Sequence, residues 1–141
     1  MPLFVSYLRF YKMPVDHVRA TQFLAERIAR DESVIFIAYE AEREKPNSAL
    51  GFVQLYPTFA SLDQKRLWIL EDLFVVPGRR RDGIGTMLLV RAEEHARETG
   101  AVRLRLETAR DNVTAQRLYE AAGWQRDQTF HVYTRELSPA S

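Results

Sequence analysis

The chain has 141 residues and a mass of 16.4 kDa, which is the size of one domain, so we treat residues 1–141 as a single domain. Its 46% hydrophobic and 28% charged residues are typical of a globular protein and argue against intrinsic disorder. With 20 Lys and Arg residues against 19 Asp and Glu residues the net charge is +1, so the chain lacks the basic surplus typical of nucleic-acid-binding proteins.

The residue types limit the available chemistry. The chain has no cysteine, which excludes disulfides, thiolate metal sites and a cysteine nucleophile. His17, His95 and His131 lack the spacing of metal ligands, so we expect no metal site. The N-terminal residues lack the pattern of a secretion signal, and no window approaches the roughly 18 apolar residues of a membrane span. We therefore expect a cytoplasmic protein that binds neither a membrane nor nucleic acid.

The first third of the chain predicts two helices and then a strand. Apolar residues over 3–12 follow a helical spacing that ends at Pro14, and Asp16 is a candidate N-cap for a second helix reaching about Arg30. Residues 34–39 (VIFIAY) are a β-branched and aromatic run typical of a strand, and the polar stretch 42–48 predicts a turn.

Strands and helices then alternate. Residues 50–56 and 67–76 predict two further strands of a meander, and residues 83–100 predict a helix. Residues 102–106 alternate as a strand, Asp111 or Asn112 caps a last helix ending at Gly123, and residues 130–137 predict a closing strand. This order predicts an α/β (α+β) fold with one mixed sheet, in which strands 67–76 and 102–106 are parallel.

The loop at residues 77–86 (PGRRRDGIGT) carries the strongest functional signal. Gly83 and Gly85 let the backbone approach a ligand, and the free N–H groups that open the next helix favour a phosphate or pyrophosphate. The spacing fits neither the Walker loop nor the dinucleotide fingerprint. A glycine-softened turn with solvated arginines is the alternative interpretation.

With its neighbouring segments, this loop resembles a motif of the GNAT superfamily of N-acetyltransferases. Residues 80–85 (RRDGIG) are similar to that superfamily's (Q/R)xxGx(G/A) loop for the coenzyme A pyrophosphate, and residues 112–124 (NVTAQRLYEAAGW) to its N-x-x-A-x-x-x-Y segment. Residues 70–75 with the following loop resemble, more narrowly, the spermidine/spermine (diamine) acetyltransferase branch. The resemblance covers roughly residues 50–137. Members usually begin with a strand, whereas residues 3–12 have a helical pattern. Three explanations are open: the strand is absent, it lies upstream, or the helical interpretation of residues 3–12 is wrong.

The resemblance implies a mixed central sheet with a splayed parallel strand pair flanked by helices. It further implies acetyl-CoA as the acetyl donor and a primary amine of a small polyamine-like, diamine-like or amino-acid-like molecule as acceptor. An aminoglycoside is also open as an acceptor. Similar proteins are often homodimers, so we expect a homodimer. The residues that match the cofactor site are Leu73, Phe74, Val75, Arg80, Arg81, Asp82, Gly83, Ile84, Gly85, Thr86, Asn112 and Ala115.

Two residues are candidates for proton transfer. An alkylammonium with a pKa near 10.4 must lose a proton before it attacks, and Glu71, in an apolar strand, is the candidate base. Tyr119 lies about two helical turns after Asn112, on the same side, and is the candidate acid for the departing thiolate. A solvated strand carboxylate and a core tyrosine are the alternatives. Without cysteine, direct transfer in a ternary complex is expected.

Four further residues are candidates for binding the acceptor. Asp72 faces away from Glu71 in a regular strand, so the two share a pocket only if a bulge intervenes. Glu107, near the end of the parallel strand, is placed to attract a second ammonium group. Tyr7 and Tyr11 belong to a front aromatic stripe that either floors the acceptor site or forms core.

Other functions remain open at this point. A noncatalytic coenzyme A-binding or sensor domain retains the loop without turnover, and a protein lysine is an alternative acceptor. Nucleic-acid binding through Arg79, Arg80 and Arg81 is the least favoured interpretation, because it depends on that short basic run alone.

Overall fold

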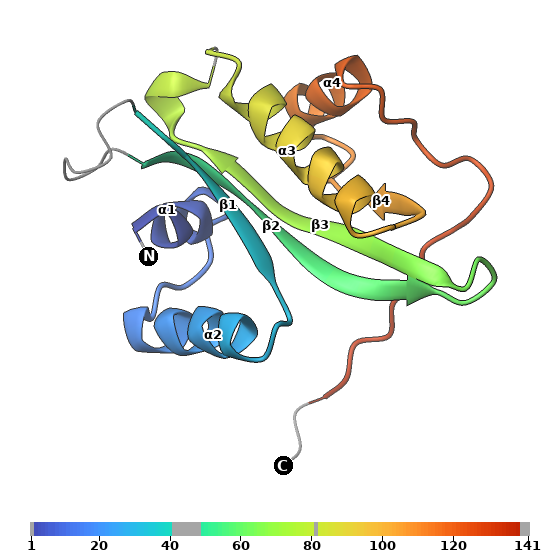
Figure 1. Cartoon of the computed structure of the whole chain (residues 1–141). Coiled ribbons are helices and arrows are strands. Elements are labelled where there is room, and N and C mark those ends of the chain that lie inside the picture. Colours follow the sequence, from blue (N-terminus) through green and yellow to red (C-terminus); the bar gives the residue numbers. More distant parts are fainter. Residues whose placement is uncertain (1, 41–48, 81, 139–141) are drawn as a thin grey trace.

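Four strands form one mixed sheet in the computed structural model, which describes residues 2–40, 49–80 and 82–138 (Figure 1). The sheet order is β1 (Val34–Tyr39), β2 (Ala49–Ala60), β3 (Lys65–Val75) and β4 (Arg103–Arg105). Strands β1 to β3 are an antiparallel meander, and β4 is parallel to β3. The predicted mixed sheet and its parallel pair are therefore confirmed. The predicted turn at 42–48 and Arg81 lie outside the described residues.

The helices begin close to the predicted positions. They are α1 (Pro2–Phe10), α2 (His17–Ala29), α3 (Ile84–Glu98) and α4 (Val113–Ala121), with a 3-10 turn at Pro77–Arg79. Asp16 caps α2 by accepting from the N–H of Arg19, and Asn112 caps α4 by accepting from the N–H of Ala115. None of the helices among the described residues combines the length and apolarity needed to cross a lipid bilayer.

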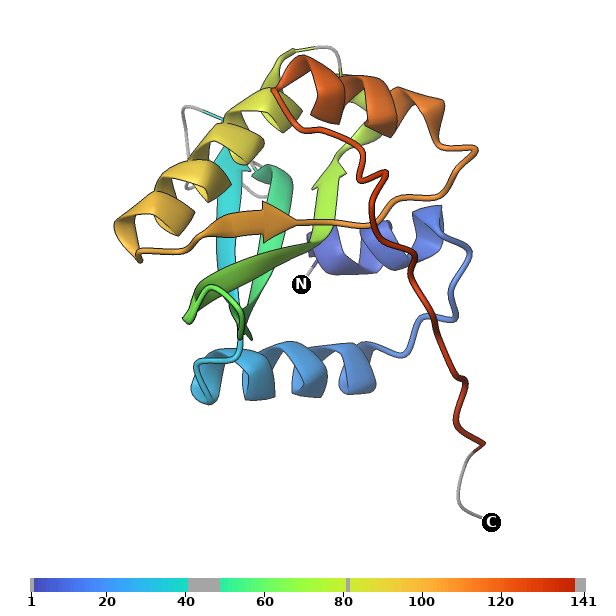
Figure 2. The ribbon, with the colours of Figure 1, turned by 90° about the vertical axis from the view of Figure 1, so that its right-hand side faces the viewer.

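The helices lie in two layers, one on each face of the sheet. Helices α3 and α4 lie over one face, and α1 and α2 lie over the other (Figures 1 and 2). The main core forms beneath α3, where Leu88 and Leu89 pack against Val53, Leu55 and other apolar residues of the sheet. Burial of this apolar surface is the main force that holds α3 in place and fixes its first turn relative to β3.

A β-bulge in β3 determines which side chains face α1. Gln54 of β2 pairs with Asp72, but the next residue of β2, Leu55, pairs with Leu70, so Glu71 is the extra residue. Leu70 and Leu73 both pack toward α3 on either side of the bulge. Glu71 and Asp72 therefore both face α1 and α2. In a regular strand these two neighbouring side chains would face opposite sides of the sheet.

The predicted closing strand at residues 130–137 is wrong. The described residues 125–138 form no helix or strand, and Phe130, Val132, Tyr133 and Leu137 are largely exposed. The alternating pattern indicates which side chains share a face, but a strand also needs a neighbouring edge with free hydrogen-bonding groups. In Figure 2 this segment leads from α4 across the molecule and away from the sheet, so it has no such partner.

Candidate active site

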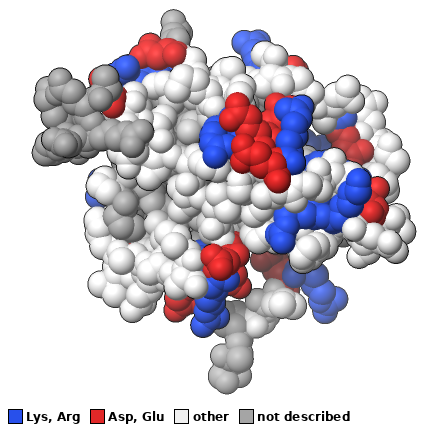
Figure 3. All heavy atoms as spheres, in the orientation of Figure 1, with Lys and Arg blue, Asp and Glu red and all other residues white. Residues whose placement is uncertain are grey.

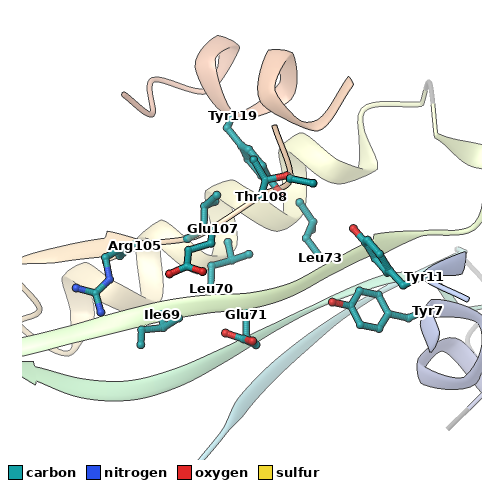
Figure 4. Close-up of a pocket in the computed structure, with 12 residues that line it drawn as sticks. Tyr7, Tyr11, Ile69, Leu70, Glu71, Leu73, Arg105, Glu107, Thr108 and Tyr119 are labelled. Atoms are coloured by element: carbon teal, nitrogen blue, oxygen red, sulfur yellow. The ribbon is translucent and has the colours of Figure 1, made fainter. Parts of the chain in front are cut away.

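A cavity of about 370 Å³ lies where the two parallel strands separate. The ladder between β3 and β4 ends at the pair formed by Ile69 and Arg105, and residues 106–109 continue without strand pairing. Helix α1 and α4 supply the remaining walls (Figure 4). The lining residues are Tyr7, Tyr11, Ile69, Leu70, Glu71, Leu73, Arg105, Leu106, Glu107, Thr108, Ala109 and Tyr119.

Glu71 projects from the bulge into this cavity. Partial burial raises its pKa most, and the nearby carboxylates of Asp72 and Glu107 raise it further. Figure 4 shows Glu107 on the opposite wall, with the hydroxyl group of Tyr7 turned toward Glu71. A carboxylate with a raised pKa, open to the cavity, is suited to accept a proton near neutral pH.

Asp72 lies beneath the cavity in a buried polar network. It is 7% exposed and accepts a 2.5 Å hydrogen bond from the side-chain amide of Gln54, which is fully buried. The oxygen of that amide accepts in turn from Ser33 at 2.7 Å. The hydroxyl group of Tyr7 also donates to Asp72, and burial together with this carboxylate raises the pKa of Tyr7. Asp72 therefore does not line the cavity itself, but it is hydrogen-bonded to Tyr7, which does.

Tyr119 enters the cavity from α4, on the side opposite Glu71 (Figure 4). It is half-buried, and its ring lies 6.0 Å from that of Trp124. Burial is the main cause that raises the pKa of Tyr119, and Tyr11 adds to it. The phenol therefore keeps its proton at neutral pH and is available as a donor.

The first turn of α3 has free donors. Gly83 has a φ of +77°, in the left-handed region that favours glycine, and no side chain caps the helix. The N–H groups of Ile84, Gly85 and Thr86 consequently have no intrahelical acceptor. At Gly85 an added Cβ would lie 3.1 Å from the side chain of Leu118, so glycine allows α3 and α4 to approach closely.

Arg80 lies between this loop and α1. Its Nε donates to the carbonyl oxygen of Val75 at 3.0 Å, and its guanidinium lies 4.5 Å from the ring centre of Phe10. In the same loop, the carboxylate of Asp82 accepts a hydrogen bond from Arg79 at 2.6 Å, so Asp82 is engaged in an ion pair.

The structure brings six of the predicted site residues into one cavity. These residues are Tyr7, Tyr11, Glu71, Leu73, Glu107 and Tyr119. The other described candidates lie outside its lining, namely Asp72, Phe74, Val75, Arg80, Asp82, Gly83, Ile84, Gly85, Thr86, Asn112 and Ala115.

Sequence reasoning missed two polar residues near the cavity. Arg105 lines it, and its alternation with Glu107 along one strand was a signal for a shared face. Gln54 supports Asp72 from beneath, and a lone amide within the apolar run of β2 was the corresponding signal.

Three comparisons with known proteins point to one family. Residues 3–124 match the family model described as the acetyltransferase (GNAT) family. The chain is 44% identical over 132 residues to "Uncharacterized N-acetyltransferase YhfO" of Bacillus subtilis (strain 168), covering 94% of this chain and 85% of that protein. A solved structure titled "Crystal structure of a probable acetyltransferase" has a TM-score of 0.90 and 45% identity, covering 99% of this chain and 90% of that one.

A relative with a named acceptor is more distant. The chain is 32% identical over 105 residues to "Aminoglycoside N(6')-acetyltransferase type 1" of Klebsiella aerogenes, covering 73% of this chain and 66% of that protein.

Proposed function

This chain belongs to the GNAT acetyltransferase family, and we propose that it transfers the acetyl group of acetyl-CoA to the primary amine of a small molecule. The observation that carries this proposal is one cavity between the separating parallel strands that holds both Glu71 and Tyr119. A candidate base and a candidate acid thus lie on opposite walls of the space where an acetyl group and an amine would meet.

The residues around the first turn of α3 fit the diphosphate of coenzyme A. The free N–H groups of Ile84, Gly85 and Thr86 form the positive end of the helix, which favours an anion. Arg80, in the same loop, adds a positive charge near Val75 and Phe10. Gly83 leaves the backbone open to close approach, because an added Cβ there would meet nothing within 4 Å. Acetyl-CoA would supply a thioester, whose acetyl carbon is the electrophile. The backbone of Leu73, Phe74 and Val75 would pair with the pantetheine arm.

The side chains of the cavity account for the proton transfers. Glu71 accepts the proton that the ammonium group of the acceptor must lose before its nitrogen can attack. As the amine displaces the thiol of coenzyme A, Tyr119 would donate its phenolic proton to the departing sulfur. The second proton, which the nitrogen loses when the amide forms, would restore the phenol of Tyr119. With no cysteine in the chain, the amine attacks the thioester directly in a ternary complex.

The acceptor class rests on charge and on relatives. Glu71 and Glu107 line the cavity and attract an ammonium group. A small amine also agrees with the relative named as an aminoglycoside N-acetyltransferase. The narrower resemblance to the diamine branch rests on residues 70–75 and the loop that follows them. Charges of both signs are interspersed over the face in Figure 3, so this face gives no support to nucleic-acid binding.

A thiol-release assay with acetyl-CoA and a panel of amines tests the proposal. We expect release that requires an amine and that slows by at least about a hundredfold in Glu71→Gln, the range for loss of a general base. Coenzyme A binding without release for any amine would instead support a noncatalytic sensor. Release with a lysine-containing peptide but with no small amine would favour a protein acceptor.

We also propose that the protein forms a homodimer, as the family resemblance implies. Light scattering in solution tests this directly. A dimer gives twice the chain mass of 16.4 kDa, and a monomer gives that mass itself.

A further inference from the structure

Arg105 is a positively charged residue in a cavity whose other charged side chains are acidic. The residues that line this cavity include two carboxylates, Glu71 and Glu107, and one guanidinium, Arg105. In a site that binds only polycations a guanidinium would weaken binding, because the guanidinium repels ammonium groups. Its presence indicates that the bound molecule carries a negative charge as well as an amine.

The strand register places these charges in a defined order. Arg105 is paired with Ile69 at the last position of the parallel ladder. Pairing ends there, and Glu107, two residues further along the chain, lies on the wall opposite Glu71, close enough for its carboxylate to raise the pKa of Glu71. Alternate residues of a strand point to the same face and lie about 7 Å apart. The backbone positions of Arg105 and Glu107 are therefore about one such step apart, and both side chains line the cavity (Figure 4).

The guanidinium of Arg105 is also free to bind a ligand. Within the part of the chain that the structure describes, it makes no hydrogen bond or ion pair. Arg103, on the same strand but outside the cavity, instead donates to Asp63 at 2.7 Å. An unpaired guanidinium beside a cavity offers the planar pair of donors that a carboxylate accepts.

We propose that Arg105 binds a carboxylate of the acceptor, and that the acceptor is an amino acid or a similar small molecule with an amine and a carboxylate within about 7 Å of each other. This inference rests on the proposed acetyl transfer. The ammonium group lies between Glu71 and Glu107, and the carboxylate lies on Arg105. A monoanion suits this site better than a phosphonate or phosphate, because a second negative charge would face the two glutamates.

Matched acceptors test the inference in the thiol-release assay. Two pairs compare an acceptor that carries a carboxylate with one that does not: γ-aminobutyrate with putrescine, and glycine with glycinamide. A third pair, β-alanine and aminoethylphosphonate, compares a carboxylate with a phosphonate. We expect the wild-type protein to have a higher kcat/KM for the carboxylate member of at least one pair. In Arg105→Gln the KM for that substrate should rise about tenfold or more, the usual effect of losing a charge-assisted bond, with little change in kcat. Arg105→Glu should shift the preference toward putrescine.

Arg103→Gln is the control, because it removes the same residue type from the same strand outside the cavity. It should leave the KM for every acceptor within about twofold, since exposed ion pairs contribute little. Equal use of both members of each pair, a preference for diamines or aminoethylphosphonate, or an unchanged KM in Arg105→Gln would each overturn the inference while leaving acetyl transfer intact. Absence of thiol release with every amine would instead refute the proposed function itself.

Discussion

Removing the buried carboxylate of Asp72 should destabilise the protein strongly. Asp72→Ala deprives two donors of their acceptor, namely the side-chain amide of Gln54 at 2.5 Å and the hydroxyl group of Tyr7. A buried donor left without a partner costs about 1–3 kcal/mol, so the two together lower the free energy of unfolding by about 2–6 kcal/mol. Asp72→Asn keeps one acceptor oxygen and should cost less.

Urea unfolding followed by circular dichroism measures these losses. Asp63→Ala is the matched control, because Asp63 is an exposed aspartate whose 2.7 Å ion pair with Arg103 lies at the surface. Its loss should cost less than about 1 kcal/mol. If Asp72→Ala costs no more than this control, the buried network does not hold β3 and α1 together as described.

Comparison of the wild type with Asp72→Asn should also reveal how Asp72 makes the free energy of unfolding depend on pH. Burial raises the pKa of Asp72 in the folded state by more than its hydrogen bonds with Tyr7 and Gln54 lower it. Between the unfolded pKa of about 3.9 and this higher folded pKa, the folded state binds more protons, so its stability falls as pH rises. Asp72→Asn lacks this contribution. The free energy of unfolding of wild type minus that of Asp72→Asn should therefore decrease from acid toward neutral pH, and an increase would refute the assignment.

The remaining predictions concern catalysis and packing. In Glu71→Gln the acid limb of the kcat/KM profile should disappear, because activity in the wild type rises as this carboxyl group loses its proton at a pKa raised by burial. Tyr119→Phe should lower kcat by about a hundredfold and leave the KM for the amine nearly unchanged, as separate steady-state fits would show. Leu89→Ala should lower the free energy of unfolding by about 3–5 kcal/mol in urea, since this side chain is 1% exposed in the core. Gly83→Ala should cost about 1–2 kcal/mol in the same assay, because its φ of +77° is unfavourable for alanine.

Local chemistry made much of the fold predictable. Asp16 was predicted as one cap, and Asp111 or Asn112 as the other, because short polar side chains before an apolar helical pattern accept from first-turn N–H groups. In the structure Asp16 and Asn112 do so. The parallel pair followed from a strand, a helix and a second strand in succession, since a helical crossover returns the chain to the same end of the sheet.

What was not predictable depends on partners distant in sequence. The bulge at Glu71 is set by how β2 and β3 align, and nothing within residues 65–75 marks the extra residue. The bulge alone brings Glu71 and Asp72 to the same face, so the position of the candidate base in the cavity depended on it. Likewise, the alternation around Tyr133 was indistinguishable from that of a paired strand, although this residue is 91% exposed.

The central claim is that the first turn of α3 and the separating strands hold acetyl-CoA. Calorimetric titration of the wild-type protein with acetyl-CoA tests it most directly. We predict binding of one molecule per chain with a dissociation constant between about 1 μM and 1 mM, the usual range for enzyme substrates, and competition by free coenzyme A. Absence of binding heat at millimolar acetyl-CoA, together with an unchanged melting temperature, would contradict the claim.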